Sequence, residues 1–401
     1  MQKIGIYQHY WGPMGGGQRF VGFIAQILAE QHAVEILHHD PTFDVRRFSE
    51  GMELDLSRVA FRCLPRPERP DWNTLNPYRR LKGEIDFCRE FSEPYDVFLE
   101  SGDLPPVFNH AKKGVLLVHF PLVSFGEFHG HDLPQWKNQR FFQRFVKNQY
   151  QRLEWRCRFS SYQRYLCNSQ FTRRWCQRRW GISPQILNPP LRGSIRPMEK
   201  QPMILALGAF AHVNHKRQDI LIETFRRFYD RFGSQLEKEG MSWKFRLVGA
   251  CKDVEEDRRF VEKLQQQAAG YPVEFLLNAS GEELLESLGT AVSLWHAMGY
   301  GVDELQNPGK TEHFGMIATE SMAAATIPMV YHAGGLPEII HHGRDGFLWS
   351  TPEELIQQTH DVLGNPARLQ EMQHAAVENA QSYGDAAFRQ RLREVLKGIV
   401  D

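Results

Sequence analysis

Residues 311–325 read Thr311-Glu312-His313-Phe314-Gly315-Met316-Ile317-Ala318-Thr319-Glu320-Ser321-Met322-Ala323-Ala324-Ala325. Gly315 allows a tight backbone approach, and the residues after it are good helix formers with no proline before Pro328. This stretch therefore predicts a loop that enters a helix. The first N–H groups of such a helix have no partner within it, so the helix start attracts an anion.

Two carboxylates flank the predicted helix start. Glu312 precedes it, and Glu320 lies one to two turns inside the helix. A phosphate at the helix start, held by the N–H groups of Gly315, Met316 and Ile317, would lie between them. We expect one ligand to contact both carboxylates.

The pair Glu312 and Glu320, with His-Phe-Gly-Met between them, resembles the donor-site motif of the retaining family 4 glycosyltransferases. Six further motifs extend the resemblance over nearly the whole chain. They are, in chain order, Gly15-Gly16-Gly17-Gln18-Arg19, Val118-His119-Phe120-Pro121, Cys167-Asn168-Ser169-Gln170-Phe171-Thr172, Asn188-Pro189-Pro190, His215-Lys216-Arg217-Gln218 and Gly334-Gly335-Leu336-Pro337-Glu338. The resemblance implies an α/β protein with the GT-B fold, in which two Rossmann-like doubly wound domains face each other across a cleft.

Length and composition are compatible with this fold. A chain of 401 residues exceeds what one hydrophobic core usually supports. The 48 basic and 48 acidic residues cancel, so the net charge gives no reason to expect a nucleic-acid partner. The six cysteines show neither a C-x-x-C pair nor zinc-finger spacing, and no apolar run has the length of a membrane span. We expect a cytoplasmic protein whose only membrane contact is peripheral, at the inner face of the cell membrane.

The first residues predict a parallel sheet. Lys3 to His9 and Ala33 to Leu37 have the pattern of strands, and Gln18 to Gln31 between them has helical spacing. A strand, a helix and a second strand in this order form a βαβ unit, which favours a parallel sheet.

The glycine loop in this unit admits three interpretations. Gly15-x-Gly17 after a strand, with Asp40 about twenty residues on, fits a nicotinamide-dinucleotide fingerprint, but Phe20 stands where the third glycine belongs. A loop that contacts phosphate through Gly16 and Gly17 without a dinucleotide is the interpretation we favour. A tight turn without a ligand is the third.

His119 is the candidate catalytic residue of the first half. Tyr95 to Glu100 and Gly114 to Phe120 predict two further strands, and His119 stands at the carboxyl end of the second, where open α/β sheets bind ligands. A lone histidine is more often structural. The family's His-x-Pro motif favours a functional role here.

The α/β pattern resumes after a linker. Asn188-Pro189-Pro190 begins a polar stretch that runs to Pro202, and strand candidates follow at 203–207, 245–249, 273–277, 292–295 and 327–332. We expect an acceptor-side domain at 1–188 and a nucleotide-sugar domain at 189–384. A C-terminal amphipathic helix at 385–401 crosses back to the first domain in the resembled fold.

Transfer from a nucleotide sugar leaves negative charge on the departing diphosphate, which the protein must stabilise. The chain has no Asp-x-Asp pair, so we expect no metal and no other cofactor. Lys216 and Arg217 lie between a predicted strand and a predicted helix and are candidate diphosphate ligands, although two solvated basic residues would show the same pattern. Ala209 follows Gly208 where family members commonly carry an arginine, so Arg217 or backbone N–H groups would have to replace that cation.

The resemblance implies roles for the matched residues. Glu312 contacts donor-sugar hydroxyls near the reacting centre, Glu320 binds the ribose, and Lys216 binds the phosphates. Phe314, Gly315, Met316 and Ile317 complete the donor site, and His119 lies near the anomeric carbon. The leaving phosphate helps to deprotonate the acceptor, so no covalent protein nucleophile is needed.

The run from Trp295 to Gly315 looks like bacterial enzymes of polysaccharide or lipid-linked oligosaccharide synthesis. GDP-mannose, UDP-glucose and other UDP-hexoses are open as donors, and a saccharide or lipid-linked saccharide as acceptor. Two other classes stay open. One is a nucleotide-sugar epimerase or hydrolase on the same fold, and the other is a non-catalytic basic-aromatic binding module.

The segment 136–180 carries twelve basic residues against the single acid Glu154, with aromatics between them. This composition suits a helix on an anionic membrane surface. A solvated basic face whose aromatics pack into the core is the alternative.

Overall fold

The computed structural model describes residues 1–9, 11, 15–65, 77–122, 153–213, 215–238 and 242–400. The chain divides into two compact units. Unit 1 comprises residues 1–188 and 389–401, and unit 2 comprises residues 189–388.

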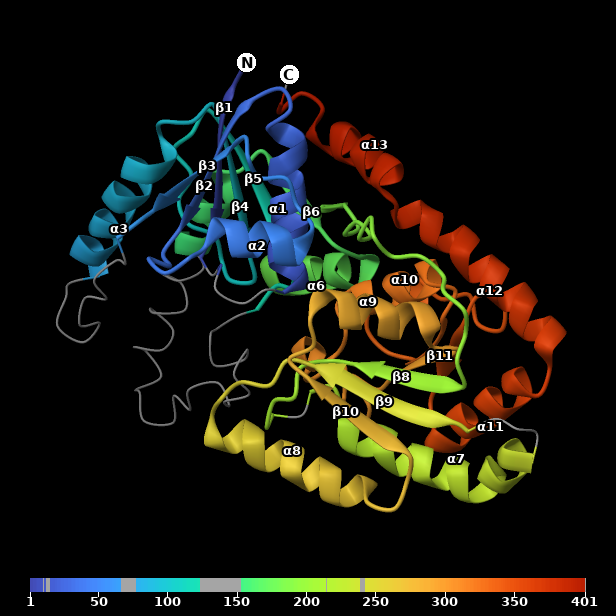
Figure 1. Cartoon of the computed structure of the whole chain (residues 1–401). Helices are drawn as coiled ribbons and strands as arrows, with labels where there is room; N and C mark the ends of the chain where they lie inside the picture. The colour runs from blue at the N-terminus through green and yellow to red at the C-terminus, as the bar shows by residue number, and fades with distance from the viewer. Residues whose placement is uncertain are drawn as a thin grey trace. The chain divides into compact units, whose positions relative to one another are not determined.

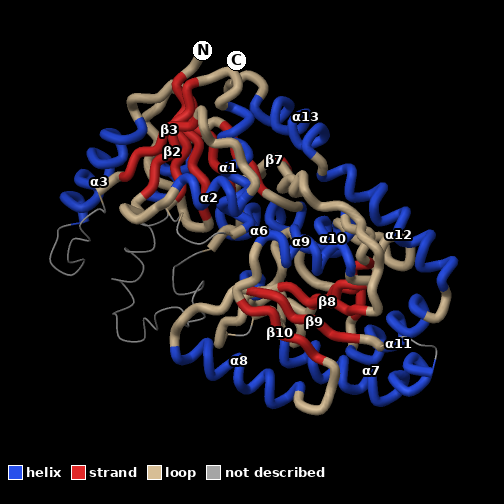
Figure 2. Tube along the Cα trace, viewed as in Figure 1, coloured by secondary structure: helices blue, strands red, loops and turns tan. Residues whose placement is uncertain are grey.

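Unit 1 contains a seven-stranded sheet with helices between the strands (Figures 1 and 2). Its elements are β1 (Lys3–Gln8), α1 (Gly16–Leu28), β2 (Ala33–His38), α2 (Val45–Met52), β3 (Val59–Cys63), α3 (Pro77–Ser92), β4 (Val97–Gly102), β5 (Lys113–Val118), β6 (Arg164–Cys167), α6 (Gln170–Trp180) and β7 (Gln185–Ile186). The strand order is β3-β2-β1-β4-β5-β6-β7, and every neighbouring pair is parallel.

Unit 2 repeats this plan with six parallel strands. Its elements are β8 (Met203–Leu207), α7 (Gln218–Lys238), β9 (Lys244–Gly249), α8 (Glu255–Ala268), β10 (Val273–Leu277), α9 (Gly281–Thr290), β11 (Ser293–His296), η1 (Pro308–Lys310), α10 (Met316–Ala323), β12 (Ile327–Tyr331), η2 (Leu336–Glu338), β13 (Phe347–Trp349), α11 (Pro352–Leu363), α12 (Pro366–Ala380), η3 (Gln381–Tyr383) and α13 (Asp385–Leu396), which continues into unit 1. The strand order is β10-β9-β8-β11-β12-β13.

In each sheet the order in which the chain adds strands reverses at one point. This switch point determines where ligands can bind. The chain moves outward from β1 through β2 to β3 and then returns to β4 on the other side of β1. In unit 2 it returns in the same way from β10 to β11, beside β8. Loops at the carboxyl ends of the two strands at such a switch point diverge and leave room for a ligand.

Helices cover both faces of the second sheet. The helices α7, α8 and α11 pack on one face around the buried aromatics Phe225, Phe245 and Trp295. The helices α9 and α10 lie on the other face (Figure 1). Burial on both sides explains why β8 and β12 are nearly continuous apolar runs.

The C-terminal residues are anchored within unit 1. Lys113 Nζ donates to the carbonyl oxygens of Gly398 and Ile399 at 3.1 and 3.2 Å. Arg389 Nη1 pairs with Glu30 Oε1 at 2.7 Å. The last turn of the chain therefore closes against the amino end of β5.

The predicted basic segment lies only partly within the described residues. Its part from 136 to 152 lies outside them. In α6 the aromatics Phe171, Trp175 and Trp180 are buried, while Arg174 and Arg178 are exposed. Here the aromatics belong to the core and the cations face solvent. Among the described residues, no helix has the length and hydropathy of a membrane span.

Candidate functional site

The loops that follow β8 and β11 bring together two predicted site residues of opposite charge. Lys216, after β8, places Nζ 2.8 Å from Glu312 Oε2. His296, the last residue of β11, places Nε2 3.2 Å from the same oxygen. Its side chain is only 3% exposed. Lys216 Nζ also lies 3.4 Å from Met298 Sδ. One carboxylate oxygen thus meets an ammonium and an imidazole at the switch point.

These contacts determine the charge state of the site. Burial would raise the pKa of the Glu312 carboxyl, but the Lys216 ammonium and the His296 contact outweigh it and lower that pKa well below its usual value. Burial lowers the pKa of His296, and the nearby Lys216 charge acts in the same direction, whereas Glu312 opposes them. At neutral pH the site therefore holds an ionised Glu312 and a neutral His296.

Two glycines fix the backbone on which Glu312 stands. Gly334 has φ +65°, and a Cβ at this position would lie 2.1 Å from the carbonyl oxygen of Glu312. The N–H of Gly335 donates to that same carbonyl at 2.8 Å. The Gly-Gly-Leu-Pro-Glu motif thus acts structurally here, by close packing against the backbone of Glu312.

The helix predicted from residues 316–325 is α10. It begins after Gly315, whose φ of +108° favours glycine, and no side chain caps its first N–H groups from that position. Met316 and Ile317 are half-buried in its first turn, and Phe314 is buried against Tyr383. An uncapped helix start beside Glu312 is the feature that a phosphate requires.

Glu320 has a partner that the sequence analysis did not identify. Its side chain is 9% exposed, and its Oε1 pairs with Arg192 Nε at 3.2 Å. Arg192 lies in the linker that follows Asn188-Pro189-Pro190, far from Glu320 in sequence. No local pattern could have linked the two residues.

Arg217, predicted as a donor ligand, makes contacts within unit 2. Its Nη1 donates to the carbonyl oxygen of Tyr300 at 2.6 Å, and its Nε pairs with Asp219 Oδ1 at 3.2 Å. These contacts hold the loop after β11.

Burial lowers the pKa of His215, and the positive charges of Lys310 and Lys216 lower it further. Lys310, which the sequence analysis did not single out, is therefore a second cation near this loop.

The residues predicted in unit 1 also come together. Gly16 and Gly17 are the first residues of α1, and a Cβ at Gly17 would lie 3.5 Å from the His119 imidazole. His119 Nε2 lies 2.7 Å from Ser101 Oγ. Burial lowers the pKa of His119, and the neighbouring Asp103 partly opposes that effect. His119 is thus a half-buried, neutral histidine beside the start of α1, where Gly15 provides no side-chain cap.

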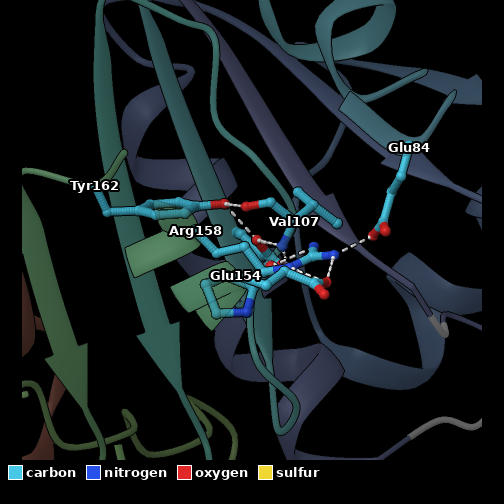
Figure 3. A network of polar contacts seen from close by, with 7 residues as sticks. Glu84, Val107, Glu154, Arg158 and Tyr162 are labelled. Carbon is cyan, nitrogen blue, oxygen red and sulfur yellow. Dashed lines mark hydrogen bonds and ion pairs between the residues drawn. The ribbon is translucent and has the colours of Figure 1, made fainter. Parts of the chain in front are cut away.

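A buried polar network supports the loop that carries Asp103 (Figure 3). Glu100 accepts hydrogen bonds from the Tyr162 hydroxyl and from the N–H of Val107. Arg158 pairs with Glu84 at 2.7 Å and with Glu154 at 2.6 Å, and it donates to the Pro106 carbonyl. The loop between β4 and β5 is therefore held from two sides.

The candidate residues thus form two groups. Lys216, Glu312, Glu320 and the start of α10 belong to unit 2, and Gly16, Gly17 and His119 belong to unit 1. Within the described ranges, no three His, Cys, Asp or Glu side chains are grouped as metal ligands would be.

Comparison with solved structures identifies the class of fold. The chain matches a sucrose-phosphate synthase from Thermosynechococcus elongatus with a TM-score of 0.68 and 14% identity, over 100% of this chain and 99% of that one. It matches a glycosyltransferase from Rickettsia africae with a TM-score of 0.64 and 13% identity, over 98% of both chains. Anabaena HepE in complex with UDP and glucose gives a TM-score of 0.65 and 13% identity, over 100% of both chains. The predicted GT-B fold of two Rossmann-like domains is confirmed.

Sequence comparison then finds a family match for the second unit. Residues 189–383 match the model of the glycosyl transferases group 1. The match covers nearly all of unit 2, residues 189–388, and agrees with the resemblance that the motifs show.

Two curated relatives illustrate the match. The GDP-Man:Man(3)GlcNAc(2)-PP-Dol alpha-1,2-mannosyltransferase of Dictyostelium discoideum is 27% identical over 208 residues, which cover 50% of this chain and 38% of that protein. The D-inositol 3-phosphate glycosyltransferase of Thermobispora bispora is 33% identical over 90 residues, which cover 22% of this chain and 21% of that protein. The matches span less than half the length of these relatives.

Proposed function

We propose that this protein is a retaining glycosyltransferase that moves a hexose from a nucleotide sugar to a saccharide or lipid-linked saccharide, without a metal. The observation that carries the proposal is the Lys216–Glu312 pair, with 2.8 Å between Nζ and Oε2, at the switch point of the second sheet. A diphosphate needs a cation there, and a sugar that develops positive charge needs an anion. The pair supplies both.

The start of α10 supplies the remaining diphosphate contacts in this proposal. Its N–H groups, after Gly315, would bind one phosphate, and Lys216 would stabilise the charge on the leaving oxygen. Lys310 is our candidate for the cation that Ala209 does not provide, because Arg217 is engaged with Asp219 and Tyr300. Glu320 would bind the ribose hydroxyls, with Arg192 holding its carboxylate in place.

The transfer step would need no covalent intermediate on the protein. The acceptor hydroxyl attacks the anomeric carbon as its bond to the diphosphate breaks, and a phosphate oxygen of the leaving group takes the proton of that hydroxyl. Attack and departure on the same face of the sugar give retention. Glu312, ionised by Lys216, would stabilise the positive charge that develops on the sugar.

GDP-mannose is the first donor to test, with UDP-glucose second. The Dictyostelium relative is named for transfer from GDP-mannose, and HepE, similar in fold, has been crystallised with UDP-glucose. A lipid-linked saccharide is the acceptor we propose, because the same relative is named for a dolichol-linked one. For a lipid-linked acceptor we place the protein at the inner face of the membrane, in peripheral contact through basic residues of 136–180.

A thermal-shift panel of GDP- and UDP-sugars tests this proposal. A ligand at 100 times its Kd adds about 2.7 kcal/mol to the unfolding free energy, which raises Tm by roughly 5 to 10 °C. We expect one donor and its nucleoside diphosphate to give such a shift. The Glu320→Gln variant should lose most of it, whereas the exposed Glu371→Gln variant should keep it.

Two outcomes would contradict the proposal. If no nucleotide sugar or nucleoside diphosphate stabilised the wild-type protein, there would be no donor site. If the stabilising donor were converted to free hexose or to an epimer at the same rate with and without acceptor, the protein would be a hydrolase or an epimerase.

A further inference from the structure

His296 is a buried histidine at the switch point of the second sheet. The transfer step proposed above gives it no role. It ends β11, and its Nε2 contacts Glu312 Oε2 at 3.2 Å, off the axis of an ideal hydrogen bond. Neither ring nitrogen has a well-aligned hydrogen-bond partner in the described part of the chain. Such an orphaned buried ring costs free energy unless water or a ligand completes it.

A small cavity beside the ring has room for such a water molecule. It has a volume of about 10 Å³, room for the centre of one water molecule, and His296, Gln218 and Lys216 contribute to its lining. The side-chain oxygen of Gln218 is also buried without a partner among the described residues. The amide nitrogen of the same side chain is occupied, since it donates to the Ala209 carbonyl at 3.1 Å. Two unsatisfied buried groups, Gln218 Oε1 and His296, therefore line one water-sized space.

The neighbouring charges select one form of the ring. An unprotonated Nε2 would direct its lone pair at the ionised Glu312 carboxylate, which is repulsive at 3.2 Å. A doubly protonated ring is opposed by burial and by the Lys216 ammonium. The neutral ring with its proton on Nε2 is the form that remains. Its Nδ1 is then an acceptor, as is Gln218 Oε1, and one water can donate to both.

We propose that His296 is a positioning residue for the transfer reaction, held with its proton on Nε2 by a buried water that bridges Nδ1 and Gln218 Oε1. In this form Nε2–H makes an off-axis, electrostatic contact with Glu312 Oε2 at 3.2 Å, and Lys216 contacts the same oxygen. Two donors on one oxygen restrict rotation of the carboxylate. They leave Oε1, which has no hydrogen-bond partner in the described residues, for the hydroxyls of the sugar. The last step rests on the function proposed above.

Nitrogen-15 NMR of histidine-labelled protein tests the tautomer without any donor. The signals of His296 are those lost in the His296→Gln variant. We expect a neutral ring, protonated at Nε2, at neutral pH. A proton on Nδ1, or an imidazolium at neutral pH, would overturn the proposal. In Gln218→Leu, which removes one acceptor of the water, a fraction of Nδ1–H should appear, and an unchanged tautomer would refute the bridging water.

Kinetics with the donor found in the thermal-shift panel test the positioning role. Misplacing a reacting group by about 1 Å can lower the rate on the order of 100-fold. We expect His296→Leu to lower kcat by about 10- to 100-fold with little change in the donor KM. His296→Gln, which keeps a donor of similar reach, should recover much of the loss. The exposed His374→Gln on α12 is the control and should match the wild type.

The outcomes separate this inference from the proposed function. If the wild type transfers no sugar, the proposed function fails, while the NMR result still decides the tautomer. If the wild type is active and His296→Leu, folded by its melting curve, keeps its kcat, the positioning role is refuted. Equal losses in the Leu and Gln variants would show that the contact donated to Glu312 is not what matters.

Discussion

Glu312 is a half-buried carboxylate that stays ionised because Lys216 Nζ lies 2.8 Å from Oε2. The spacing of Glu312 and Glu320 in one motif made both predictable from the sequence. Lys216 was a candidate from its place between a strand and a helix, and the family resemblance, not its place, favoured it. Arg192 and Lys310 were not predictable. The ion pair of Arg192 with Glu320, and the effect of the Lys310 charge on His215, arise only when loops distant in sequence come together.

The sequence also did not predict the contacts of Arg217. This residue pairs with Asp219 and donates to the Tyr300 carbonyl.

The Lys216→Ala variant tests whether the Lys216 ammonium stabilises the negative charge on the leaving diphosphate. Removing one electrostatic donor to a transition state typically lowers the rate by about 100- to 1000-fold. We expect a loss of this order in kcat, measured as nucleoside diphosphate released with acceptor present. The exposed Lys263→Ala on α8 is the matched control and should be fully active. Full activity of Lys216→Ala at saturating donor would contradict the account.

The buried carboxyl of Glu100 should make the unfolding free energy depend on pH. Burial raises its pKa from 4.5 to about 7, although the Tyr162 and Val107 hydrogen bonds oppose this. The folded state therefore binds more protons than the unfolded state between these values, so the unfolding free energy falls as pH rises from about 4.5 to about 7. A shift of this size corresponds to on the order of 3 kcal/mol.

We expect Glu100→Gln to lose most of this decline, because its side chain does not ionise. The measurement is urea unfolding at pH 5 and pH 8, with the exposed Glu93→Gln as a control that keeps the wild-type difference. A Glu100→Gln protein with the same decline as the wild type would show that Glu100 is not the titrating group.

At the scale of elements, long and strongly patterned segments were predictable and short ones were not. The predicted strands 203–207 and 273–277 coincide with β8 and β10, and the predicted helix at 316–325 contains α10. The strands β7 and β13 have two and three residues, too few for a period to emerge, and they form by pairing with β6 and β12. The strand predicted at 292–295 lies one residue later, at Ser293–His296, because pairing with β12 sets its bounds. This difference brings His296 to the strand end.

The helix α6 tests the membrane proposal within the described residues. Because its aromatics are buried, contact with a membrane would be electrostatic, through exposed arginines such as Arg174 and Arg178. Each cation near an anionic surface contributes on the order of 1 kcal/mol. We expect wild-type protein to sediment with anionic vesicles, less so as salt rises, and the double variant Arg174→Ser, Arg178→Ser to sediment less.

The control for this experiment is Arg258→Ser, which removes an exposed arginine of α8 in unit 2 that is paired with Asp253 and Glu255. It should sediment as the wild type does. Equal sedimentation on neutral and anionic vesicles, or none on either, would leave a soluble acceptor as the better proposal.

At the scale of the whole molecule, two copies of one topology carry the candidate residues at equivalent places. In each unit the residues follow the strands at the switch point: Gly16 and Gly17 follow β1, and Lys216 and Glu312 follow β8 and β11. The repeated α/β pattern and the order of motifs made this predictable. The sugar and base of the donor were not, since the loops that would select them, such as that between β11 and α10, have no period or spacing from which to infer their shape.

The most direct test is ¹H NMR of the glycoside first formed from the donor and an acceptor, in the presence of EDTA. The account predicts a product with the anomeric configuration of the donor sugar. Glu312→Gln should form it far more slowly, while still binding the nucleoside diphosphate. An inverted product, release of free hexose in place of transfer, or a reaction that proceeds only with added divalent metal would contradict it.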